Sequence, residues 1–117
     1  MTPRKKFTRN IFIFSVLSSL SLGQANEGPS AKPLEIDLSN HKFSPQVLPV
    51  PAGRPLQIRV VNLSKETIEF ESFSLNREKV VEPGKSITVR LPALKAGSYD
   101  FFDDFHQDVP EGAIVAK

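Results

Sequence analysis

The sequence contains no cysteine and no tryptophan, and its single methionine is Met1. The absence of cysteine excludes disulfide bonds, zinc–thiolate sites, thiol catalysis and any copper–thiolate bond. Because Met1 belongs to a segment that we expect to be removed, a thioether ligand is excluded as well. The chain also lacks a serine–histidine–aspartate spacing and a glycine-rich phosphate loop, so the sequence predicts no catalytic residue.

No apolar run is long enough to span a bilayer. The longest, residues 11–22 (IFIFSVLSSLSL), falls short of the roughly 20 residues that a membrane helix needs. A basic stretch precedes this run, and small residues Gly23 and Ala25 follow it, which is the order of a secretory signal. We therefore expect residues 1–25 to be a signal peptide, cleaved after Ala25, and the protein to be exported to a bacterial periplasm. An uncleaved anchor is the alternative.

Positive charge is concentrated in that signal. The whole chain carries 15 basic and 13 acidic residues, a net charge of +2. Four of the basic residues and none of the acidic ones lie in the signal. The mature chain therefore keeps 11 basic and 13 acidic residues, which gives it a net charge of −2. No basic stripe is left to neutralise phosphates, so neither DNA nor any other nucleic acid is expected as a partner.

The remainder of the chain is patterned for strands. Residues 26–33 form a polar, flexible leader, and residues 34–117 form one small domain. No window of that domain shows a 3.6-residue apolar period, and residues 76–79 (NREK) are the one place where a single helical turn is expected. Short segments with two-residue alternation, separated by proline- and glycine-containing turns, predict an all-β sandwich or small barrel. The expected strands lie within residues 34–38, 46–50, 55–63, 67–75, 85–94, 97–102 and 113–116.

The closing loop is the first candidate site. Within nine residues it contains Asp103, Asp104, His106, Asp108 and Glu111. Imidazole together with carboxylates can bind copper, iron, zinc or manganese. A solvated acidic turn at the end of a sandwich is the alternative interpretation.

The second candidate is the stretch KETIEFES. Residues two apart in a strand point the same way, so Glu69 and Glu71 share a face opposite Ile68 and Phe70. Two neighbouring carboxylates repel each other unless a cation lies between them. The alternatives are that both face water, or that they pair with basic side chains of NREK. The second histidine, His41, is expected to lie on the surface.

Several segments together resemble the EfeO-type cupredoxin-like family of periplasmic proteins. These are FSPQVLPVPAGRPLQIRVVNLS, EFES, REKVVEPGKS, LKAGSYDFFDDFH and the final GAIVA. The resemblance covers residues 34–117 and implies a single cupredoxin-like Greek-key β-sandwich linked to ferrous-iron uptake and to copper. The metal site that the resemblance implies consists of Glu69, Glu71, His106 and one of the two aspartates Asp103 and Asp104. Glu78 of REK is an additional candidate.

The electron-carrying cupredoxins are more distantly similar. Their last loop reads Y-x-F-x-C-x-x-H with a methionine soon after, and Asp103 falls at the cysteine while Glu111 falls near the methionine. Their upstream histidine follows a strand that ends in asparagine. Here Asn62 ends the strand, and Glu69 is the expected counterpart of that histidine. Without cysteine, a blue type 1 copper centre is excluded by its chemistry.

Three functional hypotheses follow from the resemblance and the loop together. The first is a periplasmic protein that binds copper or iron and delivers metal or electrons to an iron permease and other iron-uptake proteins. The second is a copper-dependent oxidase of ferrous iron that uses the same residues. The third is a metal-free module whose acidic loop docks a basic partner. A homodimer is left open.

Overall fold

The computed structural model describes residues 33–117. The predicted signal peptide, and the predicted leader up to residue 32, lie outside the described residues. The described part contains nine strands and no helix, and hence no helix suited by length and hydropathy to crossing a membrane. The prediction of an all-β sandwich is confirmed.

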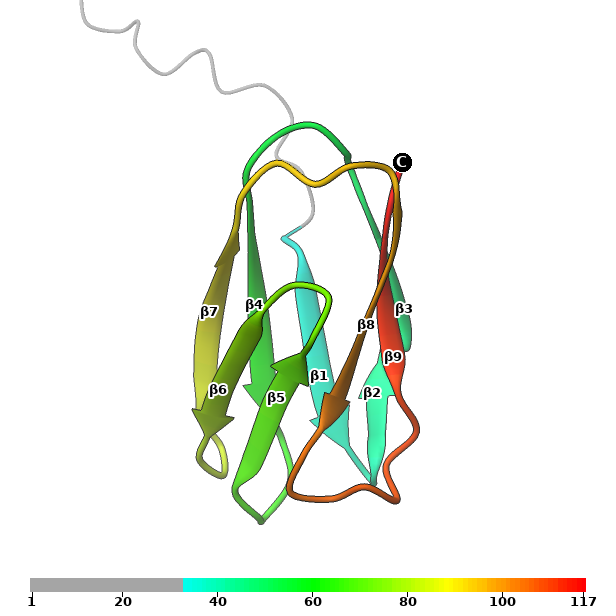
Figure 1. Ribbon diagram of the computed structural model, residues 1–117. Coiled ribbons are helices and arrows are strands. Elements are labelled where there is room, and N and C mark those ends of the chain that lie inside the picture. The colour runs from blue at the N-terminus through cyan, green and yellow to red at the C-terminus, as the bar shows by residue number, and fades with distance from the viewer. Residues whose placement is uncertain (1–32) are drawn as a thin grey trace, which may run out of the picture. The chain divides into compact units, whose positions relative to one another are not determined.

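The strands form two sheets that face each other (Figure 1). The four-stranded sheet has the order β2-β1-β4-β7, and the five-stranded sheet has the order β3-β9-β8-β5-β6. The strand bounds are β1 Glu35–Ser39, β2 Lys42–Ser44, β3 Val47–Val50, β4 Leu56–Asn62, β5 Ile68–Ser72, β6 Arg77–Val81, β7 Ser86–Leu91, β8 Gly97–Asp103 and β9 Gly112–Ala116.

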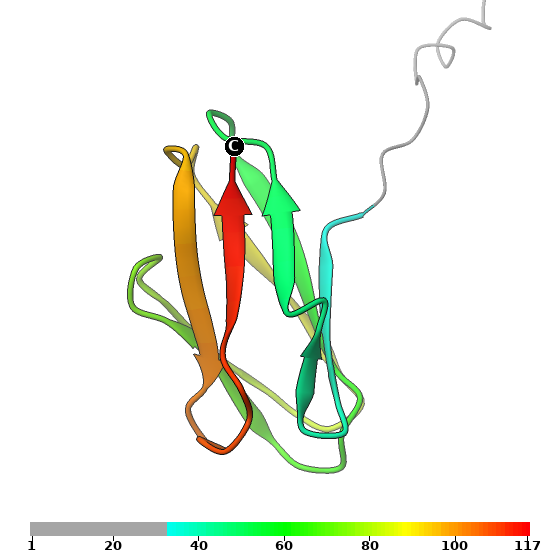
Figure 2. The same ribbon diagram turned by 90° about the vertical axis from the view of Figure 1, so that its right-hand side faces the viewer.

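Most neighbouring strands run antiparallel, with one parallel pair in each sheet. β1 runs parallel to β4, and β3 runs parallel to β9. Figure 2 shows the last strand of the chain lying between β3 and β8. The two parallel pairs join segments that are distant in sequence.

Alternating side chains fill the space between the sheets. β4 shows this most clearly, because Leu56, Ile58 and Val60 are buried while the residues between them are mostly exposed. Phe101 of β8 lies at the centre of the core and is completely buried. Its ring centroid is 4.9 Å from that of Phe43, in an edge-on arrangement, and 5.2 Å from that of Phe70, in a stacked arrangement. Such pairs add to the stability that burial alone provides.

Each predicted strand overlaps an observed one, but two strands were not predicted. β2 is only three residues long, with one buried side chain, Phe43. β6 occupies the segment for which a helical turn was expected, so that prediction is wrong. The chain turns sharply at Asn76, whose φ is 56°, and then pairs with β5 through backbone hydrogen bonds from residue 77 to residue 81. Strand pairing here outweighs the local preference of a charged segment.

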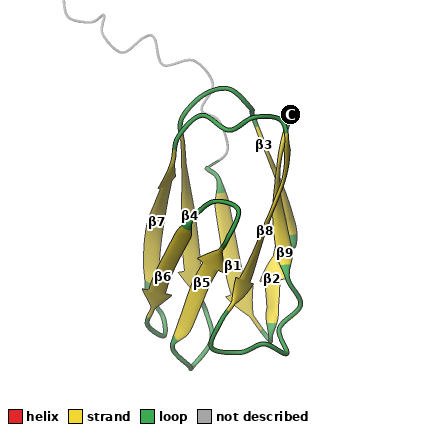
Figure 3. Ribbon diagram, in the orientation of Figure 1, coloured by secondary structure: helices red, strands yellow, loops and turns green. Residues whose placement is uncertain are grey.

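One end of the sandwich gathers four connections, shown as the lower loops of Figure 3. We call it the site end. It is formed by the β1–β2 turn, the β4–β5 loop, the β6–β7 turn and the β8–β9 loop, which comprise residues 40–41, 63–67, 82–85 and 104–111. The strand that carries Glu69 meets the start of the closing loop at this end, because Phe70 pairs with Asp103.

The central position of Phe101 can be tested by truncation. We expect Phe101→Ala to lower the free energy of unfolding by about 3–5 kcal/mol, because it empties a fully buried ring position. Phe73→Ala is the matched control, since Phe73 is 77% exposed and its loss should change stability by no more than about 0.5 kcal/mol. Urea denaturation measures both, and similar losses in the two variants would contradict this description of the core.

Candidate metal centre

The predicted ligands do not form one group, because two consecutive aspartates point to opposite sides of the sheet. Side chains alternate along a strand. Asp103 follows this rule inward and is 1% exposed, whereas Asp104 lies on the outer side and is only partly buried. The closing loop therefore contributes to two distinct clusters of polar groups.

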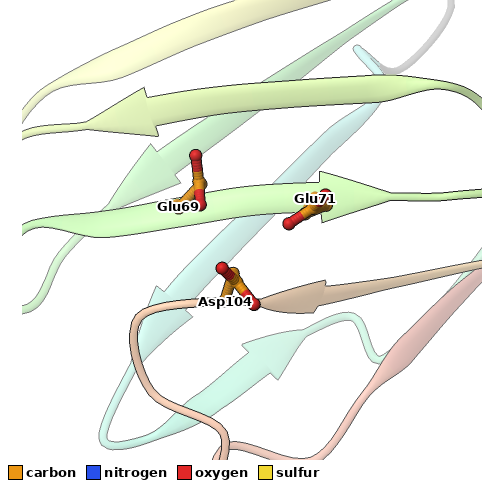
Figure 4. Close-up of side chains that lie close together, drawn as sticks. All are labelled: Glu69, Glu71 and Asp104. Carbon is orange, nitrogen blue, oxygen red and sulfur yellow. The ribbon is translucent and has the colours of Figure 1, made fainter.

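The first cluster, which we call the outer carboxylates, consists of Glu69, Glu71 and Asp104. Figure 4 shows two of them on β5 and the third just beyond the end of β8. One carboxylate oxygen from each residue lies within 4.8 Å of the other two. The shared face that the sequence predicts for Glu69 and Glu71 is confirmed, because the alternate residues Ile68 and Phe70 are buried on the opposite face.

A fourth acid increases the negative charge at this place. Glu78 of β6 lies directly opposite Glu71 in the ladder. Partial burial raises the pKa of Glu69, and the charges of Glu78, Glu71 and Asp104 raise it further. The pKa of Glu71 is raised by partial burial and then by the charges of Glu78 and Asp104. The protein therefore holds these carboxylates at a free-energy cost that a bound cation would remove.

Basic side chains do not neutralise the outer carboxylates. Within residues 33–117, no lysine or arginine forms an ion pair with them or with Glu78. The guanidinium of Arg77 instead donates to the carbonyl of Arg90 at 2.9 and 3.1 Å, and to the carbonyl of Leu75 at 3.1 Å. The structure therefore does not support the alternative in which basic side chains of NREK pair with Glu69 and Glu71.

The second cluster is centred on the buried carboxylate of Asp103. One oxygen, Oδ1, accepts hydrogen bonds from the backbone N–H groups of Glu69 and Phe105, each at 3.0 Å. The other oxygen, Oδ2, lies 2.8 Å from Nδ1 of His106. Because an ionised carboxylate only accepts, Nδ1 of the imidazole is the donor. These three contacts make Asp103 the link between β5 and the closing loop.

The second nitrogen of the imidazole faces another acid. Nε2 of His106 lies 2.7 Å from Oε1 of Glu66 in the β4–β5 loop. The hydrogen bond to Asp103 raises the pKa of His106, and the charges of Asp103 and Glu66 add to that effect, while partial burial opposes it. His106 is therefore held between two carboxylates, and its protonated form is favoured.

Glu66 was missed by the sequence reasoning, which grouped Glu69 with His106 in one metal site. The structure places the side chain of Glu69 on the other side of the sheet. Glu66 is positioned by the fully buried Asn62, whose Nδ2 donates to the carbonyls of Glu66 at 2.7 Å and Val81 at 2.9 Å. Oδ1 of Asn62 accepts from the N–H of Ser64 at 2.9 Å. An asparagine that ends an apolar strand two residues before a serine is the signal that could have identified this loop.

The remaining candidates lie apart from both clusters. The side chain of Glu111 is exposed and belongs to neither, although its carbonyl accepts from Nε2 of Gln46 at 2.8 Å. His41 is exposed, as predicted, and its Nδ1 lies 3.7 Å from Oδ2 of Asp108. Asp108 is also exposed.

The contacts of His106 predict a pH dependence of stability. A raised folded-state pKa means that the stabilisation is complete below the ordinary value of 6.5 and is lost as pH rises through the folded-state value. We expect urea unfolding of the metal-free protein to show this loss, and His106→Gln to remove it. An identical pH profile for the two proteins above pH 6.5 would contradict the ion pairs.

The repulsion among the outer carboxylates predicts a stabilising substitution. Glu71→Gln keeps the side-chain shape and removes the charge that faces Glu78. At neutral pH we expect the metal-free variant to be more stable than the natural protein. The gain should disappear below the ordinary glutamate pKa of 4.5, where the natural side chain is protonated. Glu111→Gln, which removes one charge elsewhere, is the control, and a loss of stability in Glu71→Gln at pH 7 would contradict the repulsion.

Comparison with known proteins agrees with this architecture. The family model described as cupredoxin-like domain matches residues 11–116. An uncharacterized protein of Rickettsia prowazekii (strain Madrid E) is 40% identical over 84 residues, which cover 72% of this chain and 67% of that protein.

Solved structures of amicyanin share the fold. Amicyanin from Paracoccus versutus superposes with a TM-score of 0.59 at 16% identity, over 77% of this chain and 86% of that one. The Cu(I) form of an amicyanin mutant gives a TM-score of 0.61, also at 16% identity, over 77% of this chain and 87% of that one. At this level of identity the likeness concerns the fold alone. Together with the family match, these observations show that the chain belongs to the cupredoxin-like domain family.

Proposed function

We propose that this protein is an exported metal-binding protein that takes a divalent cation on its outer carboxylates. The observation that carries the proposal is the meeting of Glu69, Glu71 and Asp104 within 4.8 Å, without a basic partner among the described residues. Carboxylate oxygens suit hard and borderline ions such as Fe(II) and Cu(II). Partial burial, and then the charges of neighbouring acids, raise the pKa values of Glu69 and Glu71, and a bound cation would relieve that repulsion.

A thiolate-bound copper of the electron-carrying type does not fit these residues. The chain has no cysteine, and the residue at the cysteine position, Asp103, already accepts three hydrogen bonds. Its carboxylate is buried and committed to holding the closing loop. We therefore derive no electron transfer through such a centre.

The resemblance to the EfeO-type family supports a place in ferrous-iron uptake. In this proposal the protein lies in the periplasm after its signal peptide, residues 1–25, is removed. It receives the metal as cargo and passes it to an iron permease system. Oxygen-only ligands are consistent with iron as cargo, whereas copper binds more tightly to most sites of any kind.

Thermal unfolding with and without metal tests the proposal. We expect Fe(II) or Cu(II) to raise the melting temperature of the purified protein, because a ligand that binds only the folded state stabilises it. At a hundredfold excess over the dissociation constant the gain is about 2.7 kcal/mol. For a domain of this size, that corresponds to a shift of the order of 10 °C or more.

Two variants locate the effect. The double variant Glu69→Gln with Glu71→Gln should lose most of the shift, while Glu111→Gln, an exposed acid outside the cluster, should keep it. An equal shift in the double variant would remove the outer carboxylates from the proposal. The absence of any shift, with any divalent ion, would overturn metal binding here altogether.

One observation favours the partner-binding hypothesis as the second candidate. Phe73 is 77% exposed, and its ring centroid lies 5.2 Å from that of Phe102, which is paired with Glu71 across the ladder. Exposed aromatic side chains beside carboxylates suit a basic protein segment. A failure of every metal to stabilise the protein would favour this role for the same face.

A further inference from the structure

A hollow lies at the tip of the β5–β6 hairpin, whose turn points away from the site end (Figure 1). Its volume is about 290 Å³. Glu71 and Glu78, which face each other across the two strands, form part of its lining, and so does the ring of Phe73, which is 77% exposed. The hollow therefore presents two carboxylates and an aromatic ring to the outside.

The hairpin tip that forms the hollow is tied to the rest of the sheet. Leu75 in the turn is buried, and its N–H donates to Oγ of Ser72 at 3.2 Å. The hydroxyl of Ser72 in turn donates to the carbonyl of Asp100 in β8 at 2.6 Å. The ring of Phe73 rests against that of Phe102, with the centroids 5.2 Å apart. A ligand thus meets groups that are already in place, which lowers the cost of binding.

The charge of the hollow is not balanced from within the protein. Arg77 belongs to its lining, but the guanidinium donates to backbone carbonyls and to neither acid. In the part of the chain from residue 33 onward, no lysine or arginine forms an ion pair with Glu71 or Glu78. The two carboxylates are therefore free to accept hydrogen bonds from a cation that a partner supplies.

A guanidinium group fits this lining better than other cations. It is planar, it can donate to two carboxylate oxygens at once, and it stacks on aromatic faces. A cation above an exposed ring gains further stabilisation. An ammonium group is more strongly hydrated and lacks the planar shape, and a bare metal ion has no use for Phe73. The hollow thus favours an arginine side chain.

The surrounding face identifies the kind of molecule that carries the arginine. Strand register places Glu69, Glu71, Glu78 and Asp100 on the outward face of β5, β6 and β8, which bears no lysine or arginine. A symmetric contact with a second copy would place these acids against the same acids, and like charges oppose such a contact. Anionic lipids are repelled for the same reason. Charge complementarity leaves a basic protein surface as the partner.

We propose that this hollow receives an arginine side chain of a basic partner protein, and that the partner and the metal compete for Glu71. Glu71 is one of the outer carboxylates and also lines the hollow. Its carboxylate cannot serve both cations fully, and the competition is reciprocal because binding free energies are linked. The inference rests on the proposed function and adds to it a means of release, in which docking of the partner weakens the hold on the metal.

Fluorescence anisotropy with labelled hexa-arginine at low ionic strength tests the docking site. We expect hexa-arginine to bind more tightly than hexa-lysine. Phe73→Ala should weaken its binding about threefold through loss of the cation–π contact, and Glu71→Gln about tenfold through loss of a charged acceptor. Phe105→Ala, which removes another exposed ring, and Glu111→Gln, which removes another exposed acid, are the matched controls. Equal affinity in Phe73→Ala, Glu71→Gln and the natural protein would overturn the site.

The same titration with saturating Fe(II) under nitrogen tests the competition. We expect Fe(II) to weaken hexa-arginine binding to the natural protein, while Phe73→Ala keeps the full thermal shift with Fe(II). Unchanged peptide affinity in a protein that Fe(II) stabilises would overturn the competition and leave the proposed function standing. No thermal shift with Fe(II), together with peptide binding that depends on Phe73 and Glu71, would overturn the proposed function and leave the docking site. A concentration-dependent dimer that Glu71→Gln abolishes, seen by sedimentation, would assign the hollow to a second copy and overturn the basic partner.

Discussion

The arrangement of the site end depends on one buried carboxylate. Asp103 is fully enclosed, and a charge in that position is tolerated only when it is well paired. Its partners are two backbone N–H groups and an imidazole, which come from β5 and from the closing loop. These contacts fix the start of the loop after β8 against β5, together with the hydrogen bond that the Asp104 N–H donates to the carbonyl of Glu69 at 3.0 Å. The orientation of His106 follows from the Asp103 carboxylate.

The two-residue repeat of a strand then separates the chemistry. Because Asp103 points inward, Asp104 must point outward, next to Glu69 and Glu71. One short segment thus serves two faces of the same sheet. The sequence alone predicts that these acids and histidines form one metal site. Strand geometry divides them into a cluster of carboxylates and a cluster that also contains an imidazole.

The parts of the fold that the sequence predicted were those with clear alternation. β4 and β7 have long apolar–polar repeats, and their burial follows the repeat. β6 could not be predicted in this way, because its residues Arg77 to Lys79 are charged and their pairing with β5 is a tertiary effect. The face shared by Glu69 and Glu71 was predictable, since it needs only strand geometry. The place of Glu66 was not, since it depends on the side chain of Asn62 inside a loop.

The two clusters deal with their charge in different ways when no metal is bound. At the inner cluster, the imidazolium of His106 lies between the carboxylates of Asp103 and Glu66, offsets part of their charge and stabilises the folded protein. At the outer cluster, no basic side chain of the described residues plays that part, and partial burial together with repulsion raises the pKa values of Glu69 and Glu71. A metal entering the outer cluster relieves the repulsion there, and because the pKa values of Glu69 and Glu71 are raised, protons compete with the metal and its affinity should fall as pH falls. The protein thus offsets charge at the inner cluster with its own imidazole and leaves the charge of the outer cluster to a cation.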